Sequence, residues 1–131
     1  MENIEKSEVV VASILAKVLQ YGLQNANLEF DDLNLENEYA SFFPTSIDWL
    51  VSEGLIRVES HQTMLNGSST ALGITLTSRG FAAMGQKING TAGEIVVSDV
   101  VKQVAESKAG YTGLGDFIGG LLGGFTKSMS S

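Results

Sequence analysis

Apolar side chains recur at spacings of three and four residues near the start of the chain, and polar side chains fall between them. The apolar set is Val9, Val10, Ile14, Val18 and Leu19, and the polar set is Glu5, Glu8, Ser13 and Lys17. This period predicts an amphipathic helix. Acidic residues crowd its first turns, where the helix dipole favours negative charge, and Gly22 is expected to end it.

A polar and acidic stretch, residues 23–38, separates this helix from a second one. We expect the stretch to form a loop followed by one or two short helical turns. Pro44 introduces the second helix, which Thr45 or Ser46 is expected to cap and Gly54 to end. Its predicted inward-facing side chains are Ile47, Leu50 and Val51, with Trp49 on the flank.

The next part of the chain alternates apolar and polar side chains, which is the period of a half-buried strand. Two such runs, residues 55–60 and 71–76, flank Asn66-Gly67, a pair typical of hairpin turns. The pattern therefore predicts an antiparallel hairpin after the second helix.

Two further helices are predicted after the hairpin. Thr77 is expected to cap a helix over residues 78–87, with Phe81 and Met84 on its apolar side. Residues 89–93 have the composition of a linker. The last amphipathic helix, which ends near residue 110, is marked by Ile95, Val96, Val100, Val101 and Val104.

This order of elements, together with two local strings, resembles a winged-helix domain. Residues 47–56, IDWLVSEGLI, are similar to the exit from the third helix into the first wing strand, and residues 76–80, LTSRG, to the string that closes the wing. The resemblance covers about residues 5–87, and small winged-helix proteins of phages and mobile elements are the most similar. It implies an α+β fold: a winged helix-turn-helix domain over residues 1–90, followed by a C-terminal helical extension over residues 91–131.

The resemblance also implies a way of binding DNA, from which this chain departs. In that family the third helix enters the major groove, and basic residues on it and on the wing contact phosphates. Here no Lys or Arg occurs from Glu36 to Gly54, and residues 61–70 are uncharged apart from His61. The acidic residues in the helical part are Glu36, Glu38, Asp48 and Glu53. Because phosphates repel carboxylates, this composition disfavours duplex binding.

The residues expected to face a partner lie around the second helix and the hairpin turn. The candidates for contact with a protein partner or with DNA are Asn37, Glu38, Ser41, Thr45, Ser46, Asp48 and Asn66. The alternative function is a sequence-specific DNA-binding regulator of the winged-helix type. Such a regulator would present neutral donors, namely Asn34, Asn37, Ser41, Thr45, Ser46 and Asn66.

Glycine and large apolar residues dominate the end of the chain. One helical face would carry Leu114, Ile118, Leu121, Leu122, Phe125 and Met129, and glycines repeat every fourth residue beside it. Such spacing lets two helices approach closely, although each glycine lowers helix propensity by about 1 kcal/mol. The self-association candidates are Gly115, Ile118, Gly119, Leu122, Gly123 and Phe125. Docking of this segment on its own domain, a flexible tail and membrane-surface insertion are the alternatives.

Composition narrows the chemistry further. The chain has 131 residues, no cysteine, one histidine, and fifteen acidic against eight basic residues, for a formal net charge of −7. The absence of cysteine excludes disulfide scaffolds and zinc ribbons, and a single histidine excludes His-rich metal sites. The acidic residues 31–38 depart from a calcium loop, because Asn37 and Phe43 stand where the loop needs Gly and Glu.

No pattern of an enzyme or a membrane protein occurs in the sequence. We find no nucleophile elbow and no phosphate-binding loop, so we expect no enzymatic activity and no cofactor. The acidic N-terminus is unlike a secretory signal and no long apolar run follows, which favours a cytoplasmic protein. The sequence thus favours a small non-enzymatic winged-helix module for protein–protein contact and self-association. A regulatory role in a mobile element or its host is in keeping with the resemblance.

Overall fold

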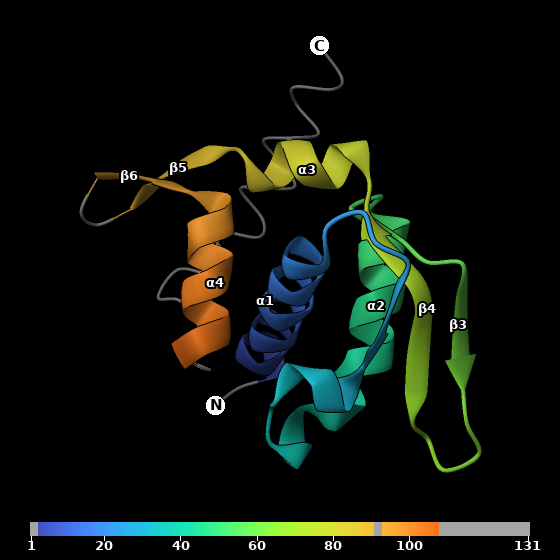
Figure 1. Cartoon of the computed structure of the whole chain (residues 1–131). Helices are drawn as coiled ribbons and strands as arrows, with labels where there is room; N and C mark the ends of the chain where they lie inside the picture. The colour runs from blue at the N-terminus through green and yellow to red at the C-terminus, as the bar shows by residue number, and fades with distance from the viewer. Residues whose placement is uncertain (1–2, 91–92, 108–131) are drawn as a thin grey trace.

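Helix α1 (Asn3–Tyr21) lies at the centre of the fold, between α2 (Phe43–Ser52) on one side and α4 (Val97–Ser107) on the other (Figure 1). The computed structural model of the chain describes residues 3–90 and 93–107. Both flanking helices contact α1, so α1 joins the two halves of the molecule. The chain therefore has the expected mixture of helices and antiparallel strands.

Strand β4 (Ser69–Leu76) organises the sheet beside these helices. β1 (Ala26–Glu29) lies antiparallel along one edge of β4, where Leu28 is opposite Ala71. β2 (Ile56–Arg57) and β3 (Ser60–Thr63) share the other edge, with Ile56 opposite Leu76. Since β2 and β3 are both short, the run predicted as one strand over residues 55–60 is divided, and only the β3–β4 part forms a long hairpin.

Short helical elements carry the chain between β1 and the hairpin. The 3₁₀ helices η1 (Phe30–Leu33) and η2 (Asn37–Phe42) follow β1, and η2 runs directly into α2. Of the one or two short helical turns expected in residues 23–38, η1 is present, and η2 begins at the end of this stretch and lies mostly beyond it. Strand β1 was not predicted. Strand β1 has only four residues, and only Leu28 among them is buried. Its sequence therefore shows too little alternation of apolar and polar side chains to predict a strand.

The return from the sheet depends on close backbone packing. Thr77 caps α3 (Ser78–Met84) as predicted, with its hydroxyl accepting a hydrogen bond from the Gly80 amide at 2.9 Å. A Cβ placed on Gly80 would lie 2.1 Å from the Leu55 carbonyl oxygen. Glycine is therefore required in the LTSRG string because α3 crosses the segment between α2 and β2 at this point.

The segment expected to be a linker forms a second hairpin. β5 (Lys87–Gly90) pairs antiparallel with β6 (Gly93–Val96), and Gln86 accepts the Val97 amide hydrogen bond at 2.8 Å. The linker prediction was wrong because Asn89 and Gly90, which have the composition of a linker, pair with Glu94 and Gly93 in this hairpin. Helix α4 consequently begins at Val97, two residues later than Ile95.

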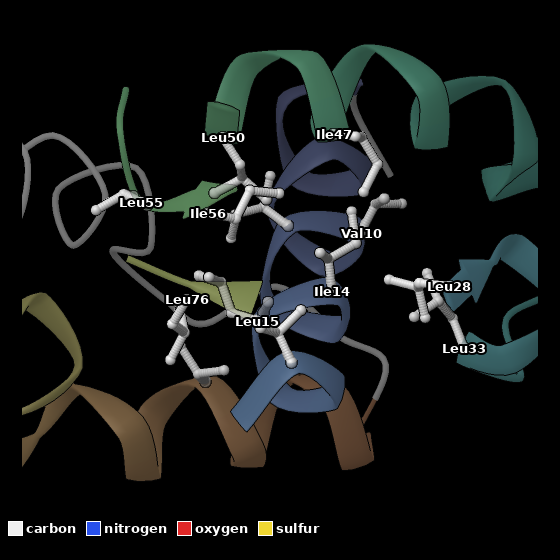
Figure 2. Packing of buried hydrophobic residues seen from close by; sticks show 14 of the residues in the cluster. Val10, Ile14, Leu15, Leu28, Leu33, Ile47, Leu50, Leu55, Ile56 and Leu76 are labelled. Carbon is white, nitrogen blue, oxygen red and sulfur yellow. The ribbon is translucent and has the colours of Figure 1, made fainter. Parts of the chain in front are cut away.

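The hydrophobic core joins α1, α2, the sheet and α4. Ile47 and Leu50 point from α2 toward α1, near Val10 and Ile14 (Figure 2). The α4 side chains in the same cluster are Val97, Val100, Val101 and Val104, each nearly or completely buried. Helix α4 thus shares the core of the first ninety residues, and the domain boundary predicted at residue 90 crosses that core.

Several side-chain orientations predicted for the helices are wrong, because each helix packs a different set of its residues against the neighbouring elements than the pattern suggests. Val51 is 39% exposed, since α2 faces the core with Phe43, Ile47 and Leu50. Phe81 is also exposed, because the short α3 buries Gly80, Ala83 and Met84 instead. Glu8 and Ser13, placed on the polar side of α1, are buried between other elements.

The predicted cap of α2 is also wrong. Neither Thr45 nor Ser46 caps the helix, which begins at Phe43 with Pro44 in its first turn and continues directly from η2. Proline suits this position because its missing amide hydrogen would have no partner inside the helix there.

Candidate partner-binding surface

Helix α2 and the β3–β4 hairpin together form one face of the molecule, which we call the helix–hairpin face. It consists of the exposed side of α2, the adjoining part of η2 and hairpin residues 61–68. The hairpin lies beside α2 and extends away from the three long helices (Figure 1). This arrangement places the predicted partner-facing residues Asn37 and Ser41 of η2 next to the predicted turn at Asn66.

A hollow of about 650 Å³ lies at the end of this face. Its lining comes from β1, η1, η2, the start of α2 and the hairpin, and comprises Glu29, Phe30, Asp31, Asn37, Ala40, Ser41, Phe43, Pro44, Asn66, Gly67, Ser68, Ser69 and Thr70. The structure therefore brings together three of the predicted candidates, Asn37, Ser41 and Asn66. The charged residues of the lining are Glu29 and Asp31, so its charge is negative.

A histidine–aspartate pair connects the two parts of the face. Nδ1 of His61, on β3, lies 2.8 Å from Oδ1 of Asp48, on α2. The Asp48 side chain is largely exposed and the His61 side chain is largely buried. His61 Nε2, where a hydroxyl nucleophile would have to bind, has no hydrogen-bond partner among the described residues. Among residues 3–90 and 93–107 the pair is thus not completed to a Ser-His-Asp triad, and it links the hairpin to the helix.

The tip of the hairpin is apolar at its outermost point. Met64 and Leu65 are exposed, and Leu65 is fully so. The turn is ordered beneath them, since Asn66 Oδ1 accepts hydrogen bonds from the Ser68 amide at 3.0 Å and the Ser68 hydroxyl at 2.7 Å. The φ of Gly67 is +90°, which fits the predicted Asn-Gly turn. A fixed turn thus presents two large apolar side chains to solvent.

The helical part of the face offers carboxylates and no basic side chain. Glu38 is exposed and forms an ion pair with Lys6 of α1 at 3.5 Å. Burial raises the pKa of the Tyr39 hydroxyl, and the Glu38 and Glu36 carboxylates raise it further. Arg57 is on β2 and Arg79 on α3, so neither arginine belongs to α2 or the hairpin turn.

Thr45 and Ser46 face a different region, the α1–α2 groove. This groove has a volume of about 550 Å³ and is lined by Ile4, Ser7, Glu8, Val11, Ser41, Phe42, Thr45, Ser46 and Trp49. Thr45 is exposed and Ser46 is buried, so Ser46 is a poor candidate for direct contact with a partner. The predicted candidate set is therefore divided between two regions, and Ser41 lines both.

Glu8 is a buried ionisable residue that the sequence pattern places on the polar side of α1. Its side chain is only 5% exposed, and burial raises the pKa of its carboxyl, with a further contribution from the Glu5 carboxylate. The signal was present in the sequence, because Ile4, Glu8 and Val11 follow helical spacing and share one stripe of α1. Glu8 was instead counted with the polar face.

The remaining predictions concern metal binding, membrane-spanning helices and the C-terminal self-association segment. Over residues 3–90 and 93–107, no three His, Asp or Glu side chains are grouped so that they could hold a metal ion. None of the described helices is both long enough and apolar enough to span a membrane. All six self-association candidates, from Gly115 to Phe125, lie outside the described residues, so self-association stays a prediction.

Comparisons of this chain with protein-family models, with curated proteins and with solved structures gave no match.

Proposed function

We propose that this chain is a winged-helix module that binds a protein partner through the helix–hairpin face. The fold assignment is supported by the connectivity. The strand order β1–β4–β2 is antiparallel, α1 precedes it, η2 and α2 are consecutive, and the β3–β4 hairpin occupies the place of a wing. In this assignment α2 corresponds to the recognition helix.

The chemistry of the hairpin tip is the observation that carries the function. A wing that binds DNA presents cations to phosphates, whereas this tip presents Met64 and Leu65. Exposed large apolar side chains surrounded by polar residues are typical of protein contacts. Because Asp48 lies on this face, and Glu29 and Asp31 line the hollow at its end, the complementary surface is apolar with basic residues around it.

This proposal is tested by comparing a variant that loses the apolar side chains of the hairpin tip with a variant that loses an exposed apolar side chain elsewhere. Met64→Ser combined with Leu65→Ser should abolish capture of a partner from a lysate of the source cells, while the wild-type chain retains it. Leu23→Ser is the matched control, because Leu23 is 76% exposed at the far end of α1. Both variants lose exposed apolar atoms. If only the tip variant loses the partner, the cause is a specific contact made by Met64 and Leu65.

DNA binding is measured alongside, as the outcome that would overturn the proposal. Fluorescence anisotropy with labelled duplex DNA at low salt should show only weak binding. Nanomolar affinity that falls steeply with added salt would establish the alternative, since that dependence reports neutralised phosphates.

A further inference from the structure

The α1–α2 groove is an apolar surface for which the described residues provide no cover. Ile4 is 62% exposed at its mouth, and the half-buried rings of Phe42 and Trp49 form its walls. Val11 is buried at its floor. A domain this small gains stability by covering such a surface, because each apolar side chain removed from water contributes about 1.5–3 kcal/mol.

The chain continues from a place close to this groove. Helix α4 ends at Ser107, at the end of the molecule where α1 begins (Figure 1). The groove is lined by residues 4–11 of α1, which belong to that same end. Twenty-four residues follow Ser107, and they are the part of the chain available to reach the groove.

The required reach is short compared with this length. The α1 residues beside α4 are Ser13, Ala16, Lys17 and Gln20, and at 100° per residue they lie opposite the groove stripe of Ile4, Glu8 and Val11. A chain leaving α4 must therefore pass halfway around a helix about 10–12 Å in diameter. About six extended residues span roughly 20 Å, so residues 108–113 are sufficient.

The next residues match the groove in chemistry. Residues 117–126 contain no charged side chain, and four large aliphatic residues and two phenylalanines occur within residues 114–126. The glycines among them allow the backbone to approach aromatic rings closely. Since the segment is tethered to its own domain, its effective concentration at the groove is in the millimolar range, above that of a second copy in dilute solution.

We propose that residues 114–126 of the chain dock in the α1–α2 groove of their own domain. This inference concerns a different surface from the helix–hairpin face and stands independently of the proposed function. Docking within one chain is an alternative to self-association. The two exclude each other, because both would use the same apolar face of the segment.

Trp49 reports directly on the groove, because it is the only tryptophan of the chain and lines the groove wall. In the full-length protein, Leu121→Ser combined with Phe125→Ser should shift Trp49 emission to longer wavelength and increase its quenching by acrylamide. Leu23→Ser is the matched control, an exposed apolar residue outside both the docking segment and the groove lining, and should leave both properties unchanged. Unfolding curves of all variants should coincide in cooperativity, since none of these residues belongs to the described core.

Three results would overturn the proposal. Unchanged Trp49 emission in the double variant would show that the segment does not cover the groove. An equal shift in the Leu23→Ser control would show that the change in Trp49 emission does not come from a specific contact in the groove. If the protein scatters light as an oligomer and Trp49 becomes protected only as concentration rises through the micromolar range, the occupant is a second copy.

Discussion

Glu8 and Gly80 show at the scale of single residues how the fold sets requirements that residue type alone does not reveal. Glu8 is buried in α1 beside the groove, where its ionised form loses hydration. Gly80 lies so close to the Leu55 carbonyl that no side chain fits without movement of the backbone. The residues next to Glu8 and Gly80 in the sequence are typical of a helix. The burial of Glu8 and the close contact at Gly80 come from other elements that pack against the two helices.

Replacement of Glu8 by glutamine should stabilise the protein near neutral pH. Because burial raises the pKa of Glu8 above its ordinary value of 4.5, the folded state binds this proton more tightly than the unfolded state. The wild-type chain therefore loses stability as pH rises from 4.5 through the higher pKa of the folded state. Urea unfolding should show a higher midpoint for Glu8→Gln at neutral pH.

This difference should decrease below pH 4.5, where Glu8 is protonated in both the folded and the unfolded state. Glu94→Gln, an exposed change in the β5–β6 hairpin, serves as the control and should have little effect at either pH. A lower midpoint for Glu8→Gln at neutral pH would contradict the assignment of a desolvated carboxyl.

At the scale of elements, α2 has two distinct faces with different tasks. One face packs Ile47 and Leu50 against α1, and the other presents Asp48 to His61 of the hairpin. The helix is consequently fixed from both sides, and the position of the hairpin follows from that of the helix. This coupling gives the helix–hairpin face a defined shape.

Two substitutions at adjacent positions of α2 separate its buried face from its exposed one. Leu50→Ala should lower the free energy of unfolding by about 2–5 kcal/mol, because Leu50 is completely buried and its removal leaves a cavity. Val51→Ala should cost about 0.5 kcal/mol or less, since Val51 is exposed. Denaturant titrations measure both values. Similar values for the two variants would mean that α2 is rotated from the orientation described.

At the scale of the whole molecule, helix α1 is shared by two packing partners. It contacts α2 and the sheet on one side and α4 on the other. The four buried valines of α4 complete the core on the second side. Residues 97–107 therefore stabilise the elements that carry the helix–hairpin face, although they lie outside the part of the chain that resembles a winged helix.

Truncation tests the contribution of α4 to the whole molecule. A chain ending after Gly90 should lose cooperative unfolding, because burial of each valine contributes about 1.5–3 kcal/mol and a domain has a total stability of only about 5–15 kcal/mol. A chain ending after Gly110 retains all of α4 and is the control. Circular dichroism during heating measures both. A cooperative transition of the shorter chain at the control's temperature would support the domain boundary at residue 90.

Much of the fold was predictable from local patterns, and most of the failures share one cause. The helices at α1, α2, α3 and α4, the Asn66-Gly67 turn and the Thr77 cap follow from periodicity and turn chemistry. Strand β1 and the exposure of Val51 and Phe81 depend on pairing and contacts between distant residues, whereas the β5–β6 hairpin is a local pairing that its linker-like composition did not predict. Of the candidate site, Asn37, Ser41 and Asn66 do meet around one hollow, whereas Ser46 is buried and Thr45 lines the other groove.

The sequence by itself determined where the helices lie, where the hairpin turns, and that the region from Glu36 to Gly54 carries acids and no bases. These properties are local, because helical period, turn type and charge depend on residues that are close together in the sequence. Only the tertiary structure decided that Asp48 meets His61, that Glu8 is buried beside an apolar groove, and that α4 shares the core with α1. Each of these depends on which faces pack together, and contacts between residues far apart in the chain are fixed by the collective burial of apolar surface.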